Sequence, residues 1–263
     1  MKRILYHIIF QLLLVTVTYA QKEIPAYGKP NLADLEMKDC DFDPGADAVK
    51  LLDVCNMYFD RGTAGFTLFK TMYHRRVRIK ILKDKGLSYA NLEVPFYASN
   101  NDQKITNIDA CTYNFDETGK IKVTEVSKNS IFIKRINRQF SKLIIAFPEA
   151  KVGSVVEYRY KLERDGYNDI KDWSFQDIIP TAYSEYEVQV PGLFMFTVKR
   201  NVVGDLQEDE KIIDDVINIG DDAYRFKTIK HKFIMHNLIG IHDEPFMAPA
   251  KDYLQRVEFL LSS

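Results

Sequence analysis

The sequence has 263 residues, and a hydrophobic content of 46% gives it enough apolar material to fold around a core, which excludes a disordered chain. Its 36 Lys and Arg residues nearly balance its 37 Asp and Glu residues, for a net charge of −1. This balance gives no electrostatic reason to expect binding to nucleic acid or to an anionic membrane surface.

The N-terminus has the pattern of a secretory signal peptide. Two basic residues precede a mostly apolar run at 4–17, and Thr18-Tyr19-Ala20 is a cleavage pattern before Gln21. The run is shorter than the ~20 apolar residues that a spanning helix needs, and it contains His7 and Gln11. We therefore predict a signal peptide over residues 1–20, no membrane span after its cleavage, and an exported protein that is periplasmic or secreted.

Residues 21–45 read as an irregular lead-in with one short helix. Asn31 is a suitable N-cap, Asp34 lies in the first turn, and Leu32 and Leu35 share a face. Residues 46–59 fit neither the helical nor the strand period, and we favour a strand because strand patterns follow.

Beyond Gly65, apolar and polar residues alternate in segments about ten residues apart, the pattern of antiparallel strands. A hairpin is expected where Gly119 can adopt a positive φ between strands at 110–115 and 120–126. We predict a mainly β fold, an antiparallel β-sandwich or large twisted antiparallel sheets, over residues 46–263. The other expected strands are 131–136, 143–147, 155–162, 186–190, 195–200, 224–229 and 253–260.

In two of these segments, 76–81 and 155–162, the alternation predicts a strand with one buried and one solvated face. Val77, Ile79 and Ile81 are expected to face the core, and Arg76, Arg78 and Lys80 the solvent. In the strand at 155–162 the apolar positions alternate with Glu157, Arg159 and Lys161, which are predicted to be solvated. Arg75, Arg76 and Arg78 are accordingly interpreted as a solvated strand face rather than a binding patch.

The three cysteines suggest no catalytic arrangement. Cys111 lies in a strand pattern without a helix N-terminus or a nearby His in sequence, so we interpret it as a packing residue rather than a nucleophile. A disulfide between Cys40 and Cys55 is permissible in an exported protein, but the odd count equally suits small buried hydrophobic residues.

The histidines His231, His236 and His242 lie five and six residues apart, which matches neither a zinc-binding helix nor a zinc finger. We predict no metal site, and no motif for another cofactor is evident.

The aromatic content of 13% permits a glycan-binding groove, because aromatic rings offer apolar faces with polar edges. Only an exposed cluster would indicate binding, and core packing is the default explanation. The ring residues that could contact a ligand are Trp173, Tyr158, Tyr160, Tyr183 and Tyr186.

Several segments, taken in order, resemble one known family. The chain is similar to the exported domain of unknown function that precedes a transglutaminase-like domain in many proteins of the Gram-negative cell envelope, over residues 28–263. Within it, Pro148 and Gly153 would bracket a turn, and the rings of Trp173 and Phe175 would enter the core. The segments that carry the resemblance are DLEM at 34–37, ADAV at 46–49, TYNF at 112–115, FPEAKVGSVVEY at 147–158, WSFQ at 173–176, IP at 179–180 and SEY at 184–186.

The resemblance implies a Cys-His-Asp site in a downstream transglutaminase-like domain, and no cysteine of this chain matches that motif. We therefore expect a non-catalytic scaffold or recognition module with a peptide or glycan ligand, accessory to a transglutaminase-like or peptidase-like domain. This chain would be a fragment of a longer protein or a stand-alone version. The alternative is a glycan-binding module of the envelope that uses exposed aromatic residues.

Overall fold

The computed structural model describes residues 24–62, 69–167, 169–219, 222–241 and 252–262. The predicted signal peptide at 1–20 lies outside these residues. Within them, no helix has both the length and the apolar composition needed to cross a bilayer.

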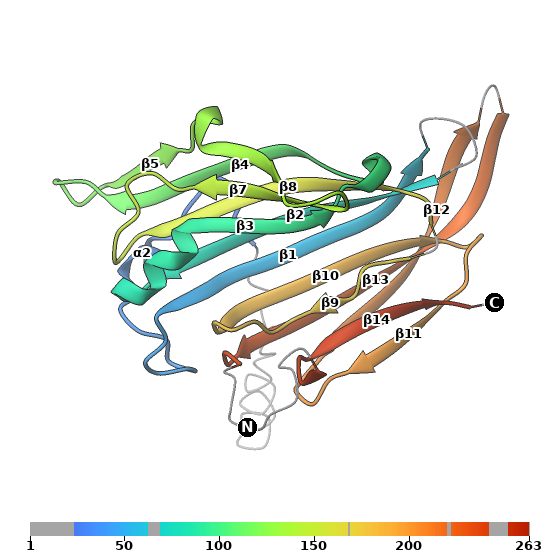
Figure 1. Ribbon diagram of the computed structural model, residues 1–263. Coiled ribbons are helices and arrows are strands. Elements are labelled where there is room, and N and C mark those ends of the chain that lie inside the picture. Colours follow the sequence, from blue (N-terminus) through green and yellow to red (C-terminus); the bar gives the residue numbers. More distant parts are fainter. Residues whose placement is uncertain (1–23, 63–68, 168, 220–221, 242–251, 263) are drawn as a thin grey trace, which may run out of the picture.

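The fold is mainly β, as predicted, with one α-helix in the described residues, α2 (Leu32–Glu36), near the N-terminus (Figure 1). An eight-stranded sheet has the order β12-β13-β10-β1-β2-β8-β4-β5, and two three-stranded sheets have the orders β11-β14-β9 and β3-β7-β6. The strands are β1 (Ala48–Arg61), β2 (Phe69–Ile81), β3 (Asn91–Tyr97), β4 (Gln103–Phe115), β5 (Ile121–Glu125), β6 (Ile131–Arg135), β7 (Phe140–Ala146), β8 (Val155–Asp165), β9 (Trp173–Ser174), β10 (Thr181–Pro191), β11 (Phe196–Asn201), β12 (Gln207–Ile219), β13 (Asp222–Leu238) and β14 (Arg256–Leu261).

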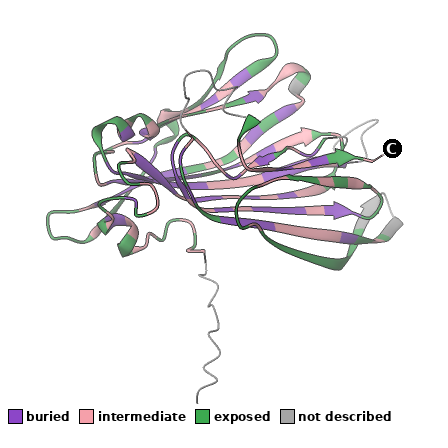
Figure 2. Ribbon diagram, turned by 90° about the horizontal axis from the view of Figure 1, so that it is seen from below, coloured by how far each residue is buried: buried purple, intermediate pink, exposed green. Residues whose placement is uncertain are grey.

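Both small sheets pack on the same face of the large sheet and enclose the main hydrophobic core. This core combines Val77 and Val188 of the large sheet with Leu143 of β7 and Phe259 of β14. Figure 2 shows buried residues alternating with half-buried ones along the long strands, as expected when one face of a sheet is covered. We call the covered face of the large sheet the core face and the opposite one the outer face.

One pair of neighbouring strands departs from the antiparallel expectation. β1 and β10 are parallel, with Lys50 opposite Thr181 and Met57 opposite Val188. Between β8 and β10 the chain crosses through the segment that holds β9, so β10 enters the sheet on the far side of β1. Such a long-range crossover leaves no local signal in the alternation.

Several local predictions are confirmed. The Asn31 side chain accepts a hydrogen bond from the Ala33 backbone N–H and caps α2, and Leu35 is buried. Leu32, however, is 51% exposed and does not share the buried face. Gly119 has φ = 77° in the β4–β5 hairpin, and the rings of Trp173 and Phe175 lie in the core.

Three strands, β3, β9 and β12, had no expectation from the sequence, and β9 has only two residues. β3 contains Pro95, which weakens its strand pattern. β12 begins Gln-Glu-Asp-Glu-Lys, a charged composition that is depleted in strands. Each is the edge strand of its sheet, where an interrupted or charged sequence is tolerated.

The prediction of a solvated face is wrong for Arg78, Lys80 and Glu157. Glu157 is fully buried and Arg78 is 2% exposed, because the lead-in packs over this end of the outer face. Arg76 Nε donates to Glu157 at 2.7 Å, and Arg78 Nη2 lies 3.2 and 3.3 Å from its two carboxylate oxygens. The Tyr113 hydroxyl also donates to this carboxylate, so that three strands meet at one buried acid.

The same residues hold the lead-in on the sheet. Arg78 Nη1 donates to Asp34 at 2.9 Å, and Arg78 Nη2 donates to the Lys29 carbonyl at 3.0 Å. Lys80 Nζ donates to the carbonyls of Leu35 and Gly153, both at 2.7 Å. Burial lowers the pKa of Lys80 to about 8. These contacts give buried partners to Arg78 and Lys80, which the strand pattern alone would place in solvent.

A second buried ionic cluster lies on the core face, and it contains Arg75, so the interpretation of Arg75 as part of a solvated strand face is wrong. Asp53 accepts from Arg75 Nε at 2.9 Å, from Arg75 Nη2 at 2.8 Å and from Lys50 Nζ at 3.0 Å. Lys50 Nζ also donates to Asp177 at 2.5 Å, which ties the segment between β9 and β10 to β1. The Arg75 guanidinium lies 5.1 Å from the centre of the Trp173 ring.

Replacing Glu157 by Gln should destabilise the chain strongly, because two buried guanidinium groups would lose their counter-charge. Breaking one side of a buried ion pair typically costs about 3–5 kcal/mol. The urea-unfolding midpoint measures this loss. Glu93→Gln, which breaks an exposed pair with Lys142, is the control and should change the free energy of unfolding by less than about 1 kcal/mol. Equal midpoints for the two variants would contradict the assigned role of Glu157.

The Asp53 cluster predicts a specific loss of stability in acid. Burial alone would raise the pKa of Asp53, but Arg75 and Lys50 lower it to about 2 from an ordinary value of 3.8. A carboxyl with a lowered folded pKa stabilises the fold above its unfolded pKa, and this stability is lost as the pH falls through the folded value.

Between pH 4 and 2, the Asp53 carboxyl should therefore account for about 2 kcal/mol of lost stability in the unmodified chain. Thermal unfolding measured across this interval should show a flatter pH dependence in Asp53→Asn. Parallel curves for the variant and the unmodified chain would disprove the assignment.

Candidate functional site

The outer face of β10, β13 and β12 carries polar side chains that no other layer covers in the described part of the chain. Glu185, Glu187 and Gln189 of β10 alternate with core residues such as Tyr186 and Val188. In β13 the core side chain of Phe233 separates two residues of the outer face, Lys232 and Ile234. The alternation therefore places a polar set from three strands on one side of the sheet.

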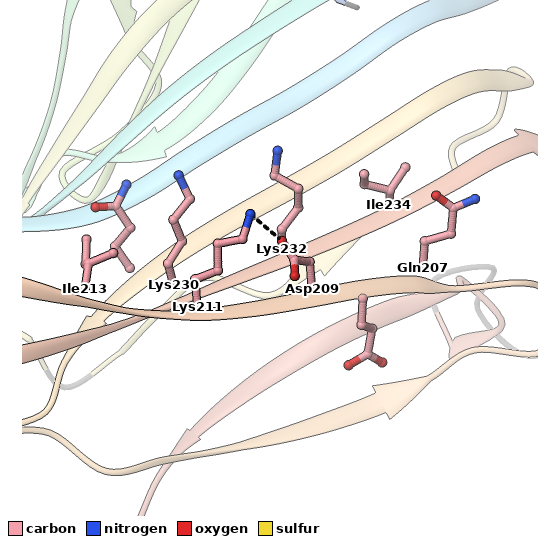
Figure 3. A pocket seen from close by; sticks show the side chains of 9 residues that line it. Gln207, Asp209, Lys211, Ile213, Lys230, Lys232 and Ile234 are labelled. Carbon is pink, nitrogen blue, oxygen red and sulfur yellow. Dashed lines mark ion pairs between the residues drawn. The ribbon is translucent and has the colours of Figure 1, made fainter. Parts of the chain in front are cut away.

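A hollow of about 470 Å³ lies across β10, β13 and β12, and we call it the lysine hollow (Figure 3). Three lysines, from β12 and β13, are among its lining residues. The full lining is Gln189, Gln207, Glu208, Asp209, Lys211, Ile213, Lys230, Lys232 and Ile234.

Carboxylates hold the lysines in place across the strands. Lys230 Nζ lies 2.8 Å from Glu187, which is 9% exposed and also accepts from Asn56 Nδ2 at 2.8 Å. Lys232 Nζ lies 3.4 Å from Glu185 and 3.7 Å from Glu187. The ladder thus runs from β1 through β10 to β13, and it fixes the lysines in orientation while leaving them about a third exposed.

The far side of the hollow belongs to β12, where Lys211 Nζ lies 3.1 Å from Asp209. Ile234 is buried and Ile213 half-exposed, so apolar surface lies between charged groups. Ammonium donors, carboxylate and amide acceptors, and apolar contacts suit a ligand that itself has amide groups and side chains of both kinds. This is a set of binding groups, without a nucleophile beside a base among the lining residues.

Tyr183 is the one predicted ligand-contact residue on the outer face. Its hydroxyl donates to Glu185, and its ring meets that of His236 edge-on at 5.1 Å. Burial is the main cause that raises the pKa of Tyr183, and the hydrogen bond to Glu185 raises it further.

The other four predicted aromatic residues are core residues. Trp173 stacks on Tyr186 at 5.1 Å, and its Nε1 donates to the Ser184 hydroxyl at 3.0 Å. Tyr158 and Tyr160 stack on each other at 6.3 Å. All four are at most 7% exposed, so they do not form the exposed cluster that glycan binding requires.

The cysteines are free thiols in the core. Cys40 and Cys55 belong to different hydrophobic clusters. Cys111 lies beside Tyr113 under the lead-in, and burial raises the pKa of its thiol.

The predicted histidines are not brought together. His231 Nδ1 lies 3.3 Å from Glu210, and burial lowers the pKa of His231. His236 lies beside Tyr183 near the end of β13, and His242 is outside the described residues. No group of three possible metal ligands occurs among the residues that are described.

The lysine hollow was missed because the predicted strand at 224–229 stops one residue before Lys230. The alternation from Lys230 to Ile234 continues the strand and could have extended it. β13 pairs on one side with β12, its neighbour in sequence, but its pairing with β10 on the other side is long-range, which the sequence pattern does not encode.

Because all three thiols are buried, maleimide should modify none of them within minutes in the folded chain and all of them in urea, as measured by intact mass. A Cys111 that reacts as fast as a free thiol in the native state would contradict this and favour a nucleophilic role. Labelling in urea is the internal control for reagent activity.

The comparisons with known proteins agree with this fold. A family model, "Domain of Unknown Function with solved-structure structure (DUF3857)", matches residues 70–217, which is more than half of the chain. A crystal structure of a "putative protease" from Parabacteroides distasonis is similar with a TM-score of 0.57 and 11% identity. The similarity covers 81% of this chain and 40% of that one, so the present chain spans about two fifths of that protein.

No curated protein matches the sequence. At 11% identity the structural likeness establishes the fold alone, whereas the family match covers β2 to β12 and thus most of the large sheet. The chain belongs to the DUF3857 family, a family of domains of unknown function.

Proposed function

We propose that this chain is an exported, non-catalytic recognition domain that holds an extended polypeptide for a transglutaminase-like or peptidase-like domain. The observation that carries the proposal is the lysine hollow with its cross-strand ladder. Ordered ammonium groups and carboxylates beside apolar residues are suited to the alternating amides and side chains of a peptide.

The groups that line the hollow have an ordered support, which favours ligand binding. Glu187 is anchored by Asn56 and Lys230, so the groups that a ligand would meet are already ordered. Preorganised groups lower the entropic cost of binding. Similarity to part of a longer protein that is described as a "putative protease" supports an accessory role beside a peptidase-like domain.

The test is binding of fluorescein-labelled, reduced and alkylated casein to the chain, followed by fluorescence anisotropy. We expect saturable binding that weakens about tenfold in a Lys230→Glu, Lys232→Glu variant, because two cationic donors become acceptors. Lys134→Glu on β6, which is exposed and far from the hollow in sequence and sheet, is the control and should bind like the unmodified chain.

Three outcomes would contradict the proposal. Equal casein binding by the hollow variant and the control would remove the hollow from recognition. Saturable binding on an array of envelope glycans, without casein binding, would favour the glycan-binding module instead. Hydrolysis of casein by the chain alone, abolished by Cys111→Ala, would replace the accessory role with a catalytic one.

A further inference from the structure

A second group of basic side chains lies on the outer face, on strands β2 and β8. Arg76 is directly opposite Arg159, and His74 is directly opposite Lys161. Like charges opposite each other on neighbouring strands are destabilising. The Arg76–Arg159 pair with the Lys161 ammonium beside it therefore calls for a negative group, whereas burial and then Lys161 lower the pKa of His74, so that its imidazole is mostly neutral near pH 7. The lysine hollow of β10, β13 and β12 contains none of these four residues.

The available carboxylates compensate this charge only in part. Arg76 Nε donates a hydrogen bond to Glu157 Oε1. The buried Arg76 Nη2 lies 2.6 Å from the same oxygen but has no hydrogen-bond geometry to it. Arg159 Nε donates to Asp109 at 2.7 Å, but both side chains of this pair are 50% exposed. Lys161 forms no ion pair with any described residue.

The strand next to β8 opens a space beside these cations. The pairing of β4 with β8 shifts register between Thr106 and Asp109, and Asn107 within this bulge has φ = 49°, in the left-handed region. A hollow of about 380 Å³ lies at the bulge, with His74, Arg76, Asn107, Asp109, Arg159 and Lys161 among its lining. Bulges often occur where a strand is shaped around a binding site.

Neighbouring aromatic groups orient two of the basic side chains. The Tyr27 ring of the lead-in lies 4.3 Å from the Arg159 guanidinium, and the Tyr58 hydroxyl is 3.1 Å from His74 Nε2. The site is therefore assembled from the lead-in and four strands, β1, β2, β4 and β8.

We propose that this bulge hollow binds an oxyanion, the carboxylate or phosphate group of a ligand, through Arg76, Arg159 and Lys161. Guanidinium groups bind planar carboxylate and phosphate oxygens with directed N–H donors, and the Lys161 ammonium adds a point charge. Arg159 can be shared between Asp109 and the ligand because that pair is open to solvent.

The test is isothermal titration of the full chain with inorganic phosphate and, separately, with acetate, at constant ionic strength. We expect one-site saturable binding of at least one anion. Lys161→Gln and Arg159→Gln should each weaken it about tenfold, the loss expected for one charge-assisted contact. Lys134→Gln, on the exposed strand β6 outside both hollows, removes the same kind of charge elsewhere and should leave binding unchanged.

Phosphate binding without acetate binding would indicate a phosphorylated ligand, and the reverse would indicate a carboxylate; either supports the site. Dissociation constants above about 10 mM for both anions would overturn the proposal. Equal weakening by Lys161→Gln and Lys134→Gln would overturn it too, because binding would then follow overall charge. The melting temperature of each variant verifies its fold.

Discussion

The buried carboxylate of Glu157 is the contact on which the outer face depends. It is fully buried, yet it meets Arg76, Arg78 and the Tyr113 hydroxyl, so that strands β2, β4 and β8 converge on one negative charge. Arg78 then reaches Asp34 of the lead-in. Charges are costly to remove from water, and this network offsets that cost only when every member is in place. The network consequently specifies where the lead-in sits and where the outer face stays open.

The two ionic clusters have complementary effects on the two faces of the large sheet. The Glu157 cluster attaches the lead-in to the outer face, whereas the Asp53 cluster joins the β9–β10 segment to β1 on the core face. With both faces fixed, the sheet between them is a stiff support. The uncovered side chains of β10, β13 and β12, and those at the β4 bulge, can therefore keep the fixed spacing that the proposed ligand binding requires.

The sequence predicted the positions of the strands better than it predicted which strands are neighbours and which side chains are covered. Alternation identified β2 and β8 because a pleated strand sends successive side chains to opposite faces. It could not tell that Arg78 and Glu157 would be covered, since the covering helix is far away in sequence. The parallel β1–β10 pair and the β10–β13 pair beneath the lysine hollow were missed because they depend on long-range pairing rather than on local periodicity. The edge strand β12 was missed because its charged composition is unusual in strands.

We propose that the uncovered outer face of β10, β12 and β13 recognises a polypeptide. Amide hydrogen exchange of the chain, measured with and without saturating alkylated casein, tests it most directly. We expect added protection in β10, β12 and β13, with unchanged exchange in β3, β6 and β7. Protection confined to β3, β6 and β7, or no change in any strand, would contradict it.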